Sequence, residues 1–253
     1  MASDKMRADQ ALVARGLVES RTRAQALIMA GKVFAGTTRI AKPGDAVAAD
    51  SPLEVRGQDH PWVSRGGIKL DHGLAAFGFS PSGLVCLDVG ASTGGFTHVL
   101  LHHGAARVHA VDVGHGQLAW QLRSDPRVVV HEGVNARYLE PALLGEPVGL
   151  AVCDVSFISV TLILPMLPPL LLPDGEIVVL VKPQFEVGRD QVGRGGIVRD
   201  PALHAAVCRK AEDAARMLGF QTSLMESPLP GAEGNKEFLL YGTGRHSRDH
   251  REA

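Results

Sequence analysis

Apolar and polar positions change their spacing along this chain, and the change predicts its secondary structure. From residue 84 onward, short apolar runs alternate with longer segments in which apolar residues recur at helical spacing. Strands that alternate with helices are typical of a doubly wound parallel sheet. The expected strands are 84–89, 107–112, 128–131, 150–154, 176–182, 221–226 and 236–241. The last two are too close for a crossover helix, so we expect them to pair antiparallel and give seven strands with one reversed.

Helix signals fill several of the gaps between these strands. The clearest helix is 201–218, because Asp200 is a favourable N-cap and Pro201 suits the first helical position. Another begins near Ser64 and runs toward Phe77, ahead of the first strand. Trp62 precedes it and suits a packing anchor, with a ligand contact as the alternative. These signals predict one large α/β domain.

The first fifty residues follow a different pattern. The expected helices are 9–14 and 21–30, and the expected strands are 32–34 and 46–48. Ser20 is a suitable N-cap for the second helix, and Gly31 a suitable end. A polar, turn-rich stretch follows at 57–61. We therefore expect a small α+β domain over 1–57, a linker over 58–65 and a large domain over 66–253, whose last residues, 244–253, form a disordered tail.

Composition excludes several classes of protein. The hydrophobic content of 45% is that of a folded globular chain rather than a disordered one. The N-terminus is polar, and the most apolar stretch, 162–173, is interrupted by prolines and too short to span a bilayer. We therefore expect a cytoplasmic protein with no membrane partner. The three cysteines lie far apart, and His98 and His102 lack a third ligand, so we expect neither a disulfide nor a metal.

Charge is distributed unevenly, although the net charge is only −1. Residues 1–42 contain eight Lys or Arg residues and three acids, a local excess of five positive charges. A small basic module attached to a neutral domain is a common way to bring an enzyme to nucleic acid. The alternative is a solvated, charged helix surface with no ligand.

A glycine-rich turn follows the first strand of the large domain. It has the pattern Asp-x-Gly-x-x-x-Gly and is followed by a helix signal. This pattern is typical of S-adenosylmethionine enzymes, whereas dinucleotide-binding proteins use Gly-x-Gly-x-x-Gly. Glycine lets the backbone approach a ligand closely. The candidate cofactor-binding residues of the turn are Asp88, Gly90, Ala91, Ser92, Gly94, Gly95 and Phe96.

Polar residues also end other strands, at the edge where α/β proteins bind ligands. Asp112 is placed to accept hydrogen bonds from a ribose diol, and its alternative is a turn-forming role at the strand end. Asn135, beyond the third strand, is a candidate for reading an adenine edge. Asp154 ends the fourth strand and is assigned to both the cofactor and the chemistry.

Two lysines and two acids are predicted to meet at the same edge. Lys182 interrupts the apolar end of the fifth strand, where a charge is costly unless it is paired. Asp154 ends a similar run, Glu237 begins the reversed strand, and Lys69 lies on the preceding helix. A structural salt bridge is one explanation of this arrangement. A catalytic cluster with a lysine general base is the other.

The residues after Asp154 restrict the kind of chemical group that could accept a methyl group. They read Val155-Ser156-Phe157, which matches neither the Asn/Asp-Pro-Pro-Tyr/Phe word of exocyclic-amine methyltransferases nor the Pro-Cys word of enzymes that attack pyrimidine carbon. A hydroxyl is the acceptor that remains, and RNA supplies a ribose 2′-hydroxyl. The long loop 183–199 leaves the sheet at this edge and is a candidate RNA clamp.

Part of the N-terminal region resembles the αL RNA-binding motif of ribosomal proteins and pseudouridine synthases. The matching positions are Ser20, Arg21, Ala24, Ile28, Gly31 and Val33, with Lys42-Pro43 downstream. In that family, the helix end and its basic residues meet RNA phosphates. The candidate RNA-binding residues of the whole chain are Arg7, Ser20, Arg21, Arg23, Lys32, Arg65, Arg189 and Arg194.

Residues 6–243 together resemble the TlyA/haemolysin-A family, which joins this motif to an FtsJ-like class I methyltransferase domain with a Rossmann-like fold. The family's Lys-Asp-Lys-Glu tetrad corresponds to Lys69, Asp154, Lys182 and Glu237. The resemblance implies S-adenosylmethionine as cofactor, Lys182 as base, and cytidine riboses in small- or large-subunit ribosomal RNA as substrates. Residues 60–63 read His-Pro-Trp-Val, where relatives tend to begin with a basic residue.

Three hypotheses follow for the function. The first is a ribosomal RNA 2′-O-methyltransferase that acts, as a monomer, on RNA or on assembled subunits. The second is an RNA-binding assembly factor whose methyltransferase fold is idle, against which the complete tetrad argues. The third is a membrane-active haemolysin, which no amphipathic basic helix supports.

Overall fold

The computed structural model describes residues 5–15, 17–18, 20–48, 51–55, 60–231 and 234–244. The chain divides into two compact units, one of residues 1–61 with 119–121 and one of the remaining residues. Most of the expected tail, 245–253, and part of the expected linker, 58–59, lie outside the described residues. The side chain of Arg189 also lies outside them.

The N-terminal unit is a small α+β domain, as predicted. Its helices are α1 (Ala8–Ala14) and α2 (Arg21–Met29). Strand β1 (Lys5–Arg7) pairs antiparallel with β4 (Ala46–Ala48), and β2 (Val33–Ala35) lies between β3 (Thr38–Arg39) and β5 (Leu53–Val55). The Ser20 hydroxyl accepts a hydrogen bond from the Arg23 backbone N–H at 3.2 Å, which confirms the N-cap. Leu12, Ile28 and Val33 lie in its apolar core.

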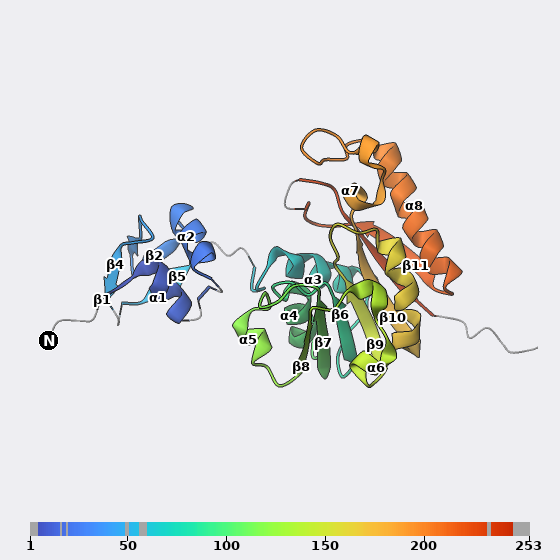
Figure 1. The fold of residues 1–253 in the computed structure, drawn as a ribbon, viewed down its shortest axis with the longest axis horizontal. Helices are drawn as coiled ribbons and strands as arrows, with labels where there is room; N and C mark the ends of the chain where they lie inside the picture. Colours follow the sequence, from blue (N-terminus) through green and yellow to red (C-terminus); the bar gives the residue numbers. More distant parts are fainter. Residues whose placement is uncertain are drawn as a thin grey trace, which may run out of the picture. The chain divides into compact units, whose positions relative to one another are not determined.

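The second unit contains a seven-stranded sheet in the order β11-β12-β10-β9-β6-β7-β8 (Figure 1). Its strands are β6 (Val85–Val89), β7 (Arg107–Asp112), β8 (Val128–Glu132), β9 (Val148–Cys153), β10 (Leu171–Val181), β11 (Gln221–Glu226) and β12 (Phe238–Thr243). Strand β12 runs antiparallel to both of its neighbours, and the pairings from β10 to β8 are parallel. The predicted sheet with one reversed strand is therefore confirmed.

Helices cover both faces of this sheet. Helix α8 (Pro201–Met217) packs on one face, where Val207 and Ala211 join a core that includes Leu87 and Val179. Helices α3 (Arg65–Phe77) and α4 (Gly95–His102) contact each other, and α3 meets the other face at Leu239 beside Gly73. The predicted N-cap of α8 is confirmed, because the Asp200 carboxylate accepts from the Ala202 N–H at 2.8 Å.

Short helices form in two segments between strands. The apolar stretch after β9 forms 3₁₀ turns η2 (Val160–Leu162), η3 (Leu164–Met166) and η4 (Pro168–Leu170), in which Leu164 and Leu170 are buried. The expectation of an unstructured loop over 183–199 was partly wrong, because α7 (Pro183–Glu186) and η5 (Arg189–Gln191) form there. Proline at the start of α7 favours a helical turn.

One-turn helices also follow β7 and β8. They are α5 (Trp120–Arg123), η1 (Ala136–Tyr138) and α6 (Pro141–Leu144). Within the described part of the chain, no helix combines the length and apolar character needed to cross a bilayer.

Candidate active site at the carboxyl edge of the sheet

The glycine-rich turn after β6 lies directly against the end of β9. Gly90 has a φ of +85°, and a Cβ added there would lie 2.5 Å from the carbonyl oxygen of Asp154. Gly94 has a φ of +93°, and a Cβ there would collide with Leu118 and Leu122. Both the conformation and the space at these positions therefore require glycine.

Asp88 connects the end of β6 to the first turn of α4. One carboxylate oxygen, Oδ2, accepts from the Thr97 N–H at 2.9 Å and from the Thr97 hydroxyl at 2.7 Å. The side chain is completely buried, and Oδ1 has no hydrogen-bond partner. Burial raises the pKa of Asp88 to about 7, and the nearby charges of Asp154 and Asp112 add to the increase. An unpartnered buried oxygen suits a donor supplied by a ligand.

Asp112, at the end of β7, closes the turn from the other side. Its Oδ2 accepts from the Ser92 N–H and its Oδ1 from the Gly114 N–H, both at 2.7 Å. The turn-forming alternative is therefore real, but each oxygen keeps a further lone pair for a ligand hydroxyl. Asp112 lines a small pocket together with Ala91, Ser92, Ala110, Gly114, Gln117, Leu118, Val130 and Glu132.

Glu132 and Gln117 are pocket residues that sequence reasoning missed. Glu132 ends β8, accepts from the Gly116 N–H at 2.8 Å and forms an ion pair with Arg123. Gln117 accepts from the Ser92 hydroxyl at 3.2 Å. An acid at the end of the strand next to Asp112 was the available signal. Asn135 does not line this pocket; its side-chain oxygen caps η1 by accepting from the Arg137 N–H at 3.0 Å.

The two predicted lysines and two predicted acids form two separate ion pairs. Lys182 Nζ lies 2.6 Å from Asp154 Oδ1 and donates to the Ser156 hydroxyl at 2.8 Å. Lys69 Nζ forms an ion pair with Glu237 Oε2. The two lysine side chains are about one-tenth exposed and Glu237 is 3% exposed, whereas Asp154 is 23% exposed. The sequence did not predict which acid pairs with which lysine.

Strand register brings the two pairs to one edge. Val181 of β10 pairs with Phe238 of β12 at the end of the antiparallel ladder. Lys182 and Glu237 are the next residues on the two strands, so they lie opposite each other one step beyond the last pair. Cys153 pairs with Val179 of β10 and with Val89 of β6, which sets Asp154 between the lysine strand and the glycine turn. If these ion pairs served only to stabilise the fold, they would not need to lie beside the glycine-rich turn.

Phe157 is the exposed residue that the sequence analysis overlooked at this edge. Its side chain is 90% exposed, and its backbone has a φ of +64°, which is rare for a bulky residue. Its ring lies 5.1 Å from the ring of Phe185, and Lys182 Nζ lies 6.0 Å from the Phe185 ring. Strain and exposure of this kind are characteristic of functional positions.

In the N-terminal unit, the buried Asp9 organises two of the predicted RNA-binding arginines. Arg7 donates two hydrogen bonds of 3.0 Å to its carboxylate, and Arg21 and Gln25 donate to Oδ2 at 3.2 and 3.0 Å. The hydrogen bonds from Arg7 hold the pKa of Asp9 far below its ordinary value. Both arginines remain about half exposed.

The remaining predicted RNA-binding residues lie in varied surroundings. Ser20 acts as a helix cap, and Arg23 and Lys32 are exposed. In the second unit, Arg65 donates to the Pro230 carbonyl at 3.3 Å, and Arg194 is exposed on the loop before α8.

Trp62 and Val63 attach the start of the second unit to α4. The Trp62 side chain is 4% exposed and packs edge-on against His98 and His102 at 5.4 and 5.1 Å. The Val63 N–H donates to His98 Nδ1 at 3.3 Å. Gly67 leaves room for the indole, because a Cβ there would lie 2.4 Å from it. Packing therefore accounts for Trp62.

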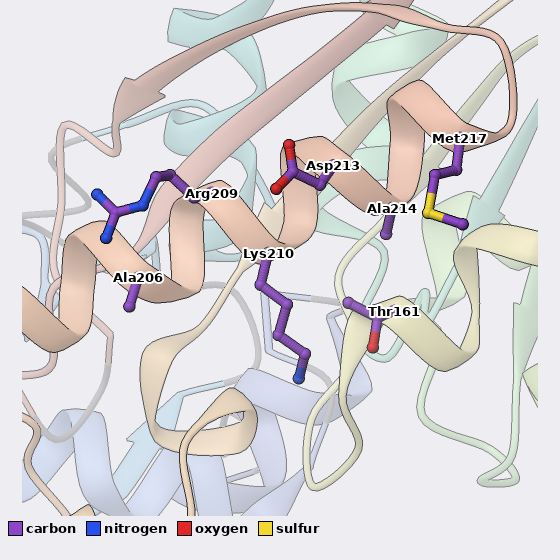
Figure 2. Close-up of a pocket in the computed structure, with 7 residues that line it drawn as sticks. All are labelled: Thr161, Ala206, Arg209, Lys210, Asp213, Ala214 and Met217. Atoms are coloured by element: carbon purple, nitrogen blue, oxygen red, sulfur yellow. The ribbon is translucent and has the colours of Figure 1, made fainter.

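An open groove lies between α8 and the 3₁₀ turn η2 (Figure 2). Its lining residues are Thr161, Ala206, Arg209, Lys210, Asp213, Ala214 and Met217. Lys210 lies 3.4 Å from the buried carboxylate of Glu186. Across the described ranges, no group of three or more His, Cys, Asp or Glu residues is arranged to hold a metal ion.

The strand order and the glycine turn define a class I methyltransferase fold, and comparisons with known proteins specify the family. The model of the FtsJ-like methyltransferase family matches residues 62–243, and that of the S4 domain matches residues 6–51. This chain belongs to the FtsJ-like methyltransferase family, and the S4 match covers the region of the predicted RNA-binding motif, which is thereby confirmed.

Close relatives cover nearly the whole chain. The 16S/23S rRNA (cytidine-2′-O)-methyltransferase TlyA of Mycobacterium tuberculosis is 51% identical over 94% of this chain and 89% of its own length. Hemolysin A of Brachyspira hyodysenteriae is 40% identical over 93% of this chain and 99% of its own. The structure of a presumed hemolysin from Streptococcus thermophilus superimposes with a TM-score of 0.75, at 43% identity, over 97% and 90% of the two chains.

The cofactor of this family is S-adenosylmethionine, and the residues present fit it. A turn without Cβ atoms at Gly90 and Gly94 leaves its backbone open to a ligand. The unpartnered oxygen of Asp88 and the free lone pairs of Asp112 offer acceptors for an amine and for ribose hydroxyls.

Proposed function

We propose that this protein methylates the ribose 2′-hydroxyl of a cytidine in ribosomal RNA, with Lys182 as the general base. The observation that carries the proposal is the position of Lys182. Its amine lies 2.6 Å from Asp154, and the backbone of Asp154 is in contact with the glycine turn that would hold the cofactor. A base and a methyl donor at one strand edge suit transfer to a hydroxyl.

S-adenosylmethionine would supply a methyl group that is already activated by the sulfonium charge. The residues that would hold it are Asp88, Gly90, Ala91, Ser92, Gly94, Gly95, Phe96, Asp112, Asn135 and Asp154. The contribution of Asn135 would come from its amide N–H groups, because the side-chain oxygen caps η1. Metal chemistry has no assigned role in this proposal.

The four charged residues would divide the remaining work. Lys182 removes the proton of the 2′-hydroxyl, and Asp154 orients the amine and stabilises it once it is protonated. The Lys69–Glu237 pair is almost fully buried, so it holds a fixed dipole beside the reacting hydroxyl. These roles predict that loss of Lys182 abolishes catalysis, whereas loss of either acid reduces it.

The exposed ring of Phe157 would receive the base of the target nucleotide. A base stacked on an aromatic side chain gains about 1–3 kcal/mol. The ring of Phe185 lies beside it and extends the apolar surface toward Lys182. Because a base must leave its helical stack to reach such a ring, the proposal favours an unpaired or extruded cytidine.

The S4 domain would deliver the RNA. Arg7 and Arg21 are held by the buried Asp9 and keep about half of their side chains exposed, so they present preorganised guanidinium groups to phosphates. Arg23, Lys32, Arg65, Arg189 and Arg194 complete the proposed contact set. The substrate is ribosomal RNA, either free or within an assembled subunit.

Transfer of a labelled methyl group from S-adenosylmethionine tests this proposal. Purified small subunits, large subunits and naked ribosomal RNA are incubated with wild-type protein and with Lys182→Ala. The proposal expects label in ribose with wild type alone. Absence of label from every substrate, with the cofactor still bound, would favour an idle fold that acts in assembly. Label with both proteins would show that Lys182 is not the general base. Release of dye from vesicles tests the haemolysin hypothesis separately.

A further inference from the structure

The amine of Lys182 has two polar neighbours that come from one short segment. Asp154 Oδ1 lies 2.6 Å away and forms an ion pair without a hydrogen bond, whereas the Ser156 hydroxyl accepts a hydrogen bond of 2.8 Å. Asp154 and Ser156 are alternate residues just beyond β9, whereas Lys182 follows β10. The parallel register pairs Cys153 with Val179, and its continuation sets Ser156 opposite Lys182. Strand register therefore brings the Ser156 hydroxyl to the amine of Lys182.

The segment that carries Ser156 is fixed at a second point. Glu186, at the end of α7, accepts from the Ser159 hydroxyl and from the Val160 N–H, both at 2.5 Å. The two stretches that follow β9 and β10 are thus joined twice, once through Ser156 and Lys182 and once through Ser159 and Glu186. Such double attachment limits the positions that the lysine amine can adopt relative to Asp154.

A neutral amine has two N–H donors and one lone pair. One donor is engaged by the Ser156 hydroxyl, and the ion pair draws the amine toward the Asp154 carboxylate, so the two contacts together restrict the direction of the lone pair. We propose that Ser156 is a positioning residue for the reaction, because its hydroxyl, together with Asp154, turns the lone pair of Lys182 toward the ribose 2′-hydroxyl. This inference rests on the proposed role of Lys182 as base.

The proton transfer balances in this arrangement. The O–H bond of the ribose breaks and a third N–H bond forms on Lys182, while the electron pair stays on the ribose oxygen and makes it nucleophilic. Ser156 keeps its own proton throughout and accepts from the amine before and after the transfer. The charged groups around the amine are Asp154 on its own edge and the Lys69–Glu237 pair across from it.

Three variants separate positioning from general packing. Ser156→Ala removes the acceptor, and Ser156→Thr keeps it. Ser159→Ala is the matched control, because it removes a hydroxyl from the same segment that bonds to Glu186 instead of the lysine. Single-turnover methyl transfer is followed at one fixed pH with S-adenosylmethionine and ribosomal RNA both saturating, and the KM of each substrate is measured in parallel.

A hydrogen bond to a charged group contributes about 1.5–3 kcal/mol, which corresponds to a rate effect of about 10- to 100-fold. Ser156→Ala is therefore expected to slow methyl transfer by about that factor with little change in either KM. Ser156→Thr should recover most of the rate, and Ser159→Ala should slow transfer by less than Ser156→Ala.

Two kinds of failure are distinguishable. An inactive wild type, or an active Lys182→Ala, would overturn the proposed function itself. If the wild type is active, Lys182→Ala is inactive and Ser156→Ala has the wild-type rate, the proposed function stands and the positioning role of Ser156 is wrong.

Discussion

Gly90 lies so close to Asp154 that a single added carbon would approach its carbonyl oxygen to 2.5 Å. The turn that would hold the cofactor and the strand end that carries Asp154, an acid of the proposed tetrad, are therefore in backbone contact. Gly90 also has a φ of +85°, so conformation and space act together at this position.

Substitution of Gly90 by alanine tests this contact. Gly90→Ala is expected to weaken S-adenosylmethionine binding at least tenfold, because the turn must move away from Asp154. Gly78→Ala is the control: its φ is +70°, but a Cβ there would meet no atom within 4 Å. It should cost about 1 kcal/mol of stability with normal binding. Calorimetric titration of both variants decides, and normal binding by Gly90→Ala would contradict the account.

The buried Asp88 makes stability fall as pH rises. Its pKa in the folded protein is about 7, whereas an unfolded aspartate titrates near 3.9. Between these values the folded state binds more protons, so ionisation of Asp88 costs on the order of 4 kcal/mol by pH 8. Asp88→Asn keeps the shape without the charge, so its stability relative to wild type should increase from pH 5 to pH 8.

Urea unfolding of both proteins at several pH values measures this effect. Other groups that titrate in the same window, such as His98 and His131, are common to both proteins and cancel in the difference. A difference between Asp88→Asn and wild type that stays constant from pH 5 to pH 8 would show that the carboxylate is already ionised at pH 5.

Substitution of Phe157 should lower the rate of RNA methylation without lowering the stability of the fold. Glycine adopts a φ of +64° without strain, so Phe157→Gly is expected to keep the free energy of unfolding within about 1 kcal/mol of wild type. Loss of a stacked base should nevertheless slow RNA methylation at least tenfold. Leu162→Ala, which removes another exposed apolar side chain nearby in sequence, is the control and should methylate normally. Equal rates for all three proteins would remove Phe157 from the substrate site.

Asp9 should support RNA binding because it stabilises the N-terminal unit and holds Arg7 and Arg21. Removal of its carboxylate in Asp9→Ala leaves Arg7 and Arg21 without their common partner and is expected to cost about 2–3 kcal/mol in the N-terminal unit. RNA affinity should fall while S-adenosylmethionine affinity stays unchanged. Arg23→Ala should weaken RNA binding without destabilising the unit. Filter binding and chemical denaturation measure the two effects, and a destabilised Asp9→Ala with normal RNA affinity would exclude these arginines from the interface.

The sequence predicted the sheet well because each buried strand is a nearly continuous apolar run that ends in a polar residue. Lys182 and Asp154 were visible for that reason, since a charge at the end of such a run has few structural explanations. Strands β1, β3 and β5 were missed, whereas β2 and β4, which are also only three residues long, were predicted.

The pattern of apolar and polar residues along the sequence could not predict side-chain pairing or backbone strain. The choice of Glu237 for Lys69 and of Asp154 for Lys182 depends on strand register and on the placement of α3. The positive φ of Phe157 and the complete burial of Asp9 follow from tertiary packing. No local spacing encodes either property, so the residues beside the tetrad emerged only from the structure.

The central claim is that Lys182 removes the proton of a ribose 2′-hydroxyl, and nucleoside mass spectrometry of treated ribosomal RNA tests it most directly. Wild-type protein, Lys182→Ala and Lys236→Ala are compared, since Lys236 forms an exposed pair with Glu226 and controls for loss of a lysine. The account predicts 2′-O-methylcytidine with wild type and Lys236→Ala, and none with Lys182→Ala. The same modified nucleoside at a similar rate with Lys182→Ala would contradict it.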